Sequence, residues 1–288
     1  MIPDKNILQD IGNDLLIAPE FPEKEYFVVQ ALKQIVENME LDGGELVFGG
    51  GTSLSTAYGL IKRFSEDIDL RFIPKPKSTA ALRQKIIEQI KNMRGFTLKG
   101  EPISDSRKLQ VKLEYQHYFP ISKEAPQRPE IKIDIFFSEK LNFEPVIKSV
   151  SSVYSRFIKQ APETSIKRVA LEETAVDKIS VLLWRLGSDK YCKNDMRHLY
   201  DLSMLYTEIT IDDKFRKIIR EVFSQDLNNR LKSDKSFNQA MIDAITVLED
   251  NRKAYEADYN KFVTSMAYVI NKSFKEAFTS FKKLLEEL

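Results

Sequence analysis

Apolar residues recur with two different periods along the first half of the chain. Between residues 23 and 40, and again between residues 80 and 93, they follow each other every three or four positions, which is typical of helices that bury one face. Shorter apolar runs have the length and composition of strands. These runs cover residues 46–48, 68–73, 96–99, 108–115 and 132–137. Helices and strands in this order predict an α+β fold with a small mixed sheet flanked by helices.

The second half of the chain has helical spacing almost throughout. Residues 171–186 and 195–206 predict two helices joined by a polar loop, and residues 212–288 predict a further helical region. The change of pattern divides the chain into two predicted domains. Residues 1–160 form an α/β domain, and residues 161–288 form a helical domain.

Composition narrows the possible chemistry. Apolar residues make up 42% of the chain and charged residues 30%, and the net charge of +1 shows no general basic bias toward nucleic acid. One cysteine excludes an internal disulfide and a zinc site built from cysteines, and two histidines argue against a histidine-rich metal centre. A metal site would therefore use oxygen ligands, which favours Mg²⁺. The N-terminus lacks the apolar core of a signal peptide and no segment has membrane-spanning length, so a cytoplasmic protein without a membrane partner is expected.

A glycine-rich turn follows the apolar run at residues 46–48. Gly50 and Gly51 would let the backbone approach a phosphate closely, and Thr52 or Ser53 would cap a helix that runs to about Tyr58. On its own, such a turn indicates only a change of chain direction. It is not a Walker loop, because the lysine-serine pair is missing, and it lacks the spacing of a Rossmann fingerprint.

Two aspartates follow on the next predicted strand. Asp67 and Asp69 lie on the same side of that strand while Ile68 faces the core. Asp134 projects from the polar side of the strand at residues 132–137. An isolated pair of this kind is often only solvated, but three carboxylates and a glycine-serine turn match the needs of two-metal phosphoryl transfer. One ion would activate the attacking hydroxyl, and the other would hold the triphosphate.

These residues resemble a known family. The segments G-G-T-S-L and R-F-S-E-D-I-D-L, within residues 50–70, are similar to the AbiEii/AbiGii-type nucleotidyltransferases, a MenT-like branch of the DNA polymerase β-like superfamily. Weaker similarity continues downstream. It covers I-K-I-D at 131–134, E-E-T-A-V-D-K at 172–178 and R-H-L-Y-D-L at 197–202.

The resemblance implies a nucleotidyltransferase fold, an NTP substrate and Mg²⁺. By position it implies that Asp67, Asp69 and Asp134 bind metal and take part in catalysis. The triphosphate would be bound by Gly50, Gly51, Thr52, Ser53 and Lys178. Asp201 matches the last aspartate of the fourth motif and is a further catalytic candidate. The helical domain would thus supply NTP-binding residues, together with a surface for a partner or an acceptor.

The fourth motif departs from the usual pattern. His198 stands where many relatives have an acid, and Asp195 is a candidate substitute. Two alternatives need no ligand: Lys178 as an exposed helix lysine, and Asp201 as the i+4 ion-pair partner of Arg197.

The predicted function is the Mg²⁺-dependent transfer of an NMP from NTP to an RNA acceptor, tRNA. The protein would be the toxin of a toxin–antitoxin or phage-defence system, with an antitoxin encoded nearby. A nucleotidyltransferase that modifies a protein or a small molecule, and a non-catalytic binding module of the same fold, are the alternatives. An RNA acceptor would suit a rim of basic residues that contact phosphates. The candidates for this rim are Lys62, Arg63, Lys75, Lys77, Lys190 and Lys193.

Overall fold

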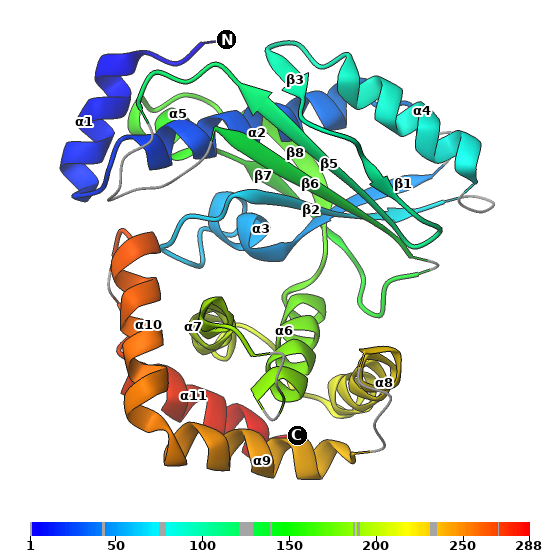
Figure 1. Ribbon diagram of the computed structural model, residues 1–288, viewed down its shortest axis with the longest axis vertical. Helices are drawn as coiled ribbons and strands as arrows, with labels where there is room; N and C mark the ends of the chain where they lie inside the picture. The colour runs from blue at the N-terminus through cyan, green and yellow to red at the C-terminus, as the bar shows by residue number, and fades with distance from the viewer. Residues whose placement is uncertain are drawn as a thin grey trace. The chain divides into compact units, whose positions relative to one another are not determined.

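The chain folds into two compact units in the computed structural model (Figure 1). The first comprises Met1–Gly59 with Arg63–Val169, and the second Leu60–Lys62 with Ala170–Leu288. The first unit extends beyond residue 160 because the strand at Thr164–Arg168 belongs to its sheet. The structure describes residues 2–41, 44–74, 79–120, 129–138, 140–186, 188, 191–230, 235–269 and 271–288.

Strands of the first unit form one mixed sheet, which confirms the predicted fold class. Within the described ranges the strands are β1 (Glu45–Gly49), β2 (Asp67–Ile73), β3 (Phe96–Leu98), β4 (Ile103–Ser104), β5 (Lys108–Tyr115), β6 (Glu130–Phe137), β7 (Val146–Val150) and β8 (Thr164–Arg168). Their order is β3-β5-β6-β2-β1-β8-β7, and β4 pairs with β5. β2 lies at the centre, antiparallel to β1 and parallel to β6.

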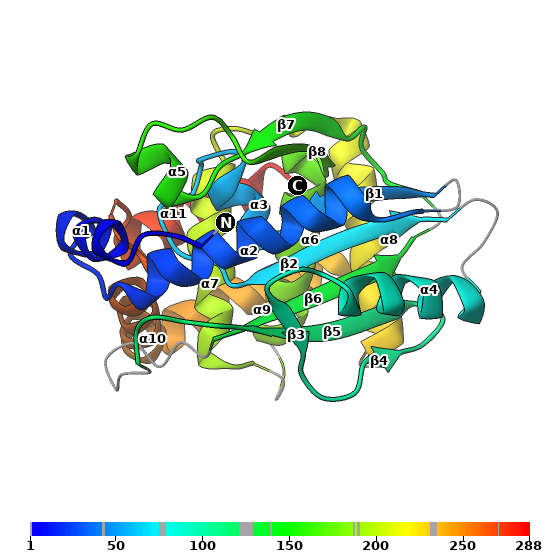
Figure 2. The same cartoon turned by 90° about the horizontal axis from the view of Figure 1, so that it is seen from above.

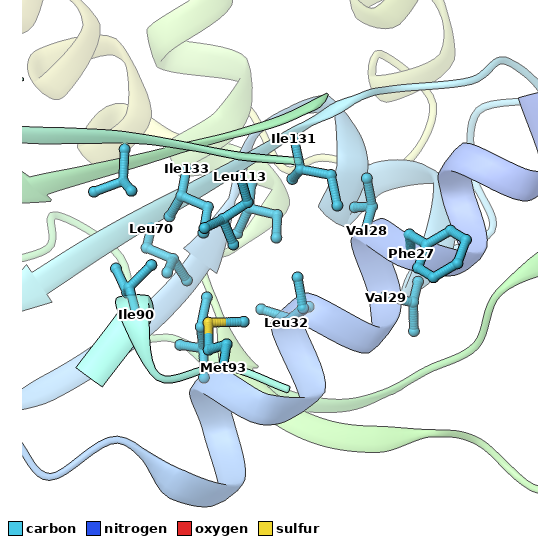
Figure 3. Packing of buried hydrophobic residues seen from close by; sticks show 14 of the residues in the cluster. Phe27, Val28, Val29, Leu32, Leu70, Ile90, Met93, Leu113, Ile131 and Ile133 are labelled. Atoms are coloured by element: carbon cyan, nitrogen blue, oxygen red, sulfur yellow. The ribbon is translucent and has the colours of Figure 1, made fainter. Parts of the chain in front are cut away.

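Helices cover one face of this sheet. The unit contains α1 (Lys5–Leu15), α2 (Glu20–Asn38), α3 (Gly50–Thr56), α4 (Ala80–Lys91) and α5 (Val153–Phe157). Figure 2 shows α2 and α4 on the same face of the sheet. In Figure 3, Val28 and Leu32 of α2 lie against Ile131 and Ile133 of β6, and all four side chains are fully buried. Each such side chain contributes roughly 1.5–3 kcal/mol by leaving water, so the apolar face of β6 is fixed toward the helices.

The start of α3 differs from the prediction. The helix begins at Gly50 with Gly49 as its N-cap residue, so Thr52 and Ser53 lie inside the helix instead of capping it. The reason is that Gly50 adopts φ 69°, which turns the chain into the helix earlier than a hydroxyl cap would. Five elements were not predicted, namely α1, α5, β4, β7 and β8. β7 is exposed at four of its five residues, so it lacks the alternation of a half-buried strand.

The second unit is helical. Its elements are α6 (Leu171–Leu186), the 3₁₀ turn η1 (Lys193–Asp195), α7 (Met196–Leu205), α8 (Asp213–Arg230), α9 (Phe237–Asp250), α10 (Arg252–Met266) and α11 (Phe274–Glu286). The predicted helical region after residue 212 is thus divided, with Ser236 and Ser273 capping α9 and α11. α6 packs against α7, α8 and α9, and Trp184 and Phe281 are buried in this core. Among the described helices, none has both the length and the apolar composition needed to cross a membrane.

Candidate active site

The glycine turn between β1 and α3 lies against an aspartate of β2. Gly49 is the register partner of Asp69 in the antiparallel β1–β2 pair. A Cβ atom added at Gly50 would lie 2.0 Å from Asp69 Oδ2, and the φ of 69° at this position disfavours any L side chain. Glycine is therefore required here for two reasons, and it lets the Asp69 carboxylate approach the turn.

The three residues after Gly50 form the rest of the turn. A Cβ atom at Gly51 would lie 2.7 Å from Arg63 Nη2, so this glycine gives room to a buried arginine. The Thr52 hydroxyl donates to the Asp67 carbonyl oxygen at 2.5 Å and fastens α3 to β2. Ser53 Oγ is also buried, but it has no hydrogen-bond partner among the described residues. Because buried polar atoms are usually paired, Ser53 Oγ is a candidate ligand-binding atom.

The three predicted metal ligands lie on one face of the sheet. Asp67 and Asp69 alternate with buried Ile68 and Leu70 along β2, as predicted. Asp69 is the register partner of Asp134 in the parallel β2–β6 pair. Side chains that are paired in this way on neighbouring strands point to the same side and lie close together. The fold thus brings Asp134 beside Asp69 from a distant part of the sequence.

Basic and amide side chains join these carboxylates. Lys132 Nζ lies 2.7 Å from Asp67 Oδ2 and 3.6 Å from Asp134 Oδ2. Lys108 Nζ lies 3.1 Å from Asp134 Oδ2, and Gln110 Nε2 donates to Asp134 Oδ1 at 2.7 Å. Sequence reasoning identified none of these three residues as part of the site, although Lys132 lies within the I-K-I-D segment. Their alternation with Ile133 and Leu109 was a signal for the polar face of the sheet, but it did not identify their partners.

The charge of Lys132 is fixed by its surroundings. Burial alone would lower the pKa of its ammonium group. The hydrogen bond to Asp67 and the negative charges of Asp67, Asp134 and Asp69 outweigh burial, so the pKa is raised above its ordinary value. The Lys132 side chain therefore carries its positive charge at neutral pH.

The donor set suits a hard cation. The carboxylates of Asp67, Asp69 and Asp134 offer only oxygen ligands, which is the preference of Mg²⁺. The Lys132 ammonium already lies close to an oxygen of Asp67 and an oxygen of Asp134, so this face of the sheet attracts positive charge. In the described ranges, no three side chains of His, Cys, Asp or Glu form a ready-made metal centre. The assignment of the three aspartates as metal ligands stays a prediction.

A buried ion pair lies within the helical unit. Lys178 Nζ of α6 lies 2.6 Å from Asp201 Oδ2 of α7, and both residues are buried. Lys178 is therefore not an exposed helix lysine, and Asp201 is bound across two helices. The sequence predicted both residues from separate motifs, but it did not predict that they contact each other.

His198 and Asp195 do not reproduce the acid found in many fourth motifs. Burial, followed by the positive charges of Lys178 and Arg197, holds the pKa of His198 well below its ordinary value, so the imidazole is neutral. Asp195 is buried, forms an ion pair with Arg185 and accepts a hydrogen bond from the Cys192 amide. Since these contacts secure the chain just before α7, Asp195 has a structural role.

Only part of the predicted basic rim lies within the described residues. Lys75, Lys77 and Lys190 lie outside the described residues. Arg63 is buried and donates to the Phe64 carbonyl oxygen at 2.9 Å, so it belongs to the interior. Arg63 is therefore not an exposed member of this rim.

Comparison with known proteins identifies the family. The chain matches the family described as "Nucleotidyl transferase AbiEii toxin, Type IV TA system" over residues 35–284. Its fold is similar to that of the MenT4 nucleotidyltransferase toxin from Mycobacterium tuberculosis, with a TM-score of 0.59, 17% identity, and coverage of 97% of this chain and 96% of that one. A putative nucleotidyltransferase from H. pylori matches with a TM-score of 0.47, 14% identity, and coverage of 94% and 95%.

No match to a curated protein sequence is found. The family match covers most of the chain, including the glycine turn and the strand with Asp67 and Asp69. The chain therefore belongs to the AbiEii family of nucleotidyltransferase toxins of type IV toxin–antitoxin systems.

Proposed function

We propose that this nucleotidyltransferase moves an NMP from an NTP to an RNA acceptor, tRNA, in a Mg²⁺-dependent reaction. The observation that carries the proposal is the β2–β6 register, which pairs Asp69 with Asp134 on the polar face of the sheet. Gly50 brings the turn against the Asp69 carboxylate. The glycine turn and the acidic side chains are thereby adjacent, which supports a role of the turn as a phosphate cradle beside a metal site.

The turn is proposed to bind the triphosphate. Gly50 and Gly51 allow close backbone approach, and Ser53 Oγ, which is buried without a partner among the described atoms, would donate to a phosphate oxygen. Thr52 keeps α3 in place through its bond to the Asp67 carbonyl oxygen. Lys178 is proposed to bind NTP phosphates through its ammonium group, and Asp201 to orient that group.

The aspartates of the sheet are proposed to hold the metal. When bound there, Mg²⁺ would neutralise the charge of the triphosphate and activate the acceptor hydroxyl. A bond forms between the acceptor oxygen and the α-phosphorus while the bond to the β-phosphate breaks, and pyrophosphate leaves. Asp134, which is 5% exposed, accepts the hydroxyl proton.

The biological setting follows from these substrates. Because NTPs and tRNA are cytoplasmic, we place the activity in the cytoplasm. We propose that modification of tRNA inhibits growth, and that this inhibition serves in phage defence. The partner implied by the family is an antitoxin.

The test is to incubate the protein with total RNA, Mg²⁺ and each labelled NTP in turn. We expect label in a tRNA-sized band, lost in Asp134→Asn and retained in Glu130→Gln. Glu130 is a matched control because it lies on the same strand and the same face as Asp134. It pairs with Lys99 at 2.9 Å and Lys112 at 3.9 Å, whereas other lysines contact Asp134. Label on a protein or on a small molecule would show that the acceptor is not RNA. Equal transfer by Asp134→Asn and the wild type would overturn the assignment of the site.

A further inference from the structure

We propose that Lys132 is an internal counter-cation of the acidic site, and that a divalent metal binds only when the Lys132 ammonium leaves Asp67 and Asp134. This inference rests on the proposed metal site. It gives a role to Lys132, which lies within the I-K-I-D segment but is not one of the site residues that the resemblance implies.

The position of the Lys132 ammonium explains why it would compete with a metal ion for the same carboxylates. Its Nζ lies 2.7 Å from Asp67 Oδ2 and 3.6 Å from Asp134 Oδ2. Mg²⁺ binds carboxylate oxygens at about 2.0–2.1 Å and requires a nearly octahedral shell. A metal ion on the same Asp67 oxygen would lie within about 5 Å of the ammonium, and the two positive charges would repel each other. The two cations therefore compete for the same carboxylates.

The position of Lys132 on the sheet makes this exchange feasible. It is the register partner of Asp67 and lies on the same face of β6 as Asp134. The side chains of Lys132 and Asp67 are each 33% exposed, so the flexible lysine stem can swing into solvent without leaving a buried void. Without metal, the ammonium instead reduces the repulsion between the neighbouring carboxylates.

Asp134 has further support that stays when Lys132 moves. Lys108 Nζ lies 3.1 Å from its Oδ2, and Gln110 Nε2 donates to its Oδ1 at 2.7 Å. Both residues come from β5, on the side of β6 away from β2. Lys132 is thus the exchangeable cation, and Lys108 with Gln110 keeps the Asp134 carboxylate oriented.

The same face of the sheet offers a matched control. Lys112 is the register partner of Lys132 on β5, and its Nζ lies 3.9 Å from Glu130. Lys112→Met removes the same charge from the same face without removing a contact to Asp67 or Asp134. A difference between Lys132→Met and Lys112→Met therefore separates direct competition from a general change in charge.

The experiment measures Mn²⁺ binding to the full chain by electron paramagnetic resonance, without nucleotide. We expect Lys132→Met to bind Mn²⁺ roughly three- to tenfold more tightly than the wild type, which is the range for releasing a partly exposed ion pair and one nearby charge. Lys112→Met is expected to change the affinity by less than about twofold. In EDTA, Lys132→Met should melt at a lower temperature than the wild type, and Mn²⁺ should raise its melting temperature by a larger amount.

Three outcomes have distinct meanings. Equal or weaker Mn²⁺ binding by Lys132→Met, with wild-type binding that is lost in Asp69→Asn, overturns the competition and leaves the proposed metal site intact. Equal gains in Lys132→Met and Lys112→Met also overturn it. Absence of Mn²⁺ binding in every variant overturns both proposals. If Lys132→Met does not fold, as judged by circular dichroism, Lys132→Gln replaces it under the same criteria.

Discussion

Replacing Gly50 by alanine tests whether the glycine turn positions the Asp69 carboxylate. The added Cβ would lie 2.0 Å from Asp69 Oδ2, whereas non-bonded heavy atoms pack at about 3.5 Å. The carboxylate must therefore move by about 1.5 Å, or the turn must move by a similar distance. Displacements of about 1 Å at a reacting centre cost on the order of 100-fold in rate. We expect Gly50→Ala to lose at least that much transfer activity.

Gly59 provides a control for the cost of placing alanine at a positive φ without a steric contact. It has φ 63°, close to the 69° of Gly50, but a Cβ there meets nothing within 4 Å. Alanine in this conformation costs about 1–2 kcal/mol, which corresponds to a fall of roughly 2–8 °C in melting temperature for a unit of this size. Gly59→Ala should show this loss of stability while it keeps its activity, and Gly50→Ala should lose both.

The assay compares both variants in differential scanning calorimetry and in transfer of labelled nucleotide to RNA. If Gly50→Ala has the activity and the melting temperature of Gly59→Ala, the contact between the turn and Asp69 has no importance for function. The reasoning about the turn would then be refuted. A loss of stability in Gly50→Ala without any loss of activity would refute its catalytic part alone.

Other side chains give separate predictions. Asp201→Ala removes the carboxylate that lies 2.6 Å from the buried Lys178 ammonium and should lower the free energy of unfolding by about 3–5 kcal/mol. Lys178→Met combined with Asp201→Leu should cost much less. Urea denaturation measures both, and equal losses would contradict the pairing. Ser53→Ala removes a buried hydroxyl without a partner among the described atoms, so the melting temperature should stay the same or rise while NTP binding, measured by calorimetry, weakens about 10- to 100-fold; unchanged binding would contradict the role of Ser53. His198 has its pKa lowered by burial, so the unfolded state binds more protons below pH 6.5 and the folded state loses stability as the pH falls through that range, by at most about 1.4 kcal/mol per pH unit. In His198→Gln, urea denaturation at pH 7.5, 6.5 and 5.5 should show a smaller loss of stability than in the wild type. Equal losses would contradict a neutral imidazole in the folded state.

Local patterns predicted the acidic face of the sheet because strand alternation is a local property. Asp67 and Asp69 alternate with buried residues, and so does Asp134, so each could be placed on a polar face from its own neighbours. The register between β2 and β6 is set by pairing across a long stretch of chain, and no local pattern encodes it. The contacts of Lys132 depend on that register, which is why sequence reasoning missed them.

In the helical unit, too, local structure was predicted and long-range contacts were not. Residues 171–186 were predicted with the bounds observed for α6, because the apolar spacing of that segment is clear. The contact between Lys178 and Asp201 depends on how α6 packs against α7, and the motifs containing these residues reveal nothing of that packing. The start of α3 was missed for a different reason. The positive φ of Gly50 decides it, and glycine alone does not specify one conformation.

The parallel pairing of β2 with β6 bears on the order of events during synthesis. β1, the glycine turn and β2 leave the ribosome before β3, β4 and β5, and β6 follows only after these. A parallel pair cannot form through a tight hairpin, so Asp134 reaches Asp69 only when this long-range contact closes. The nascent chain thus carries the turn and two of its acids well before the third arrives. Assembly of the acidic face is therefore a late folding step, which would delay the activity of a toxin until the centre of its sheet is complete.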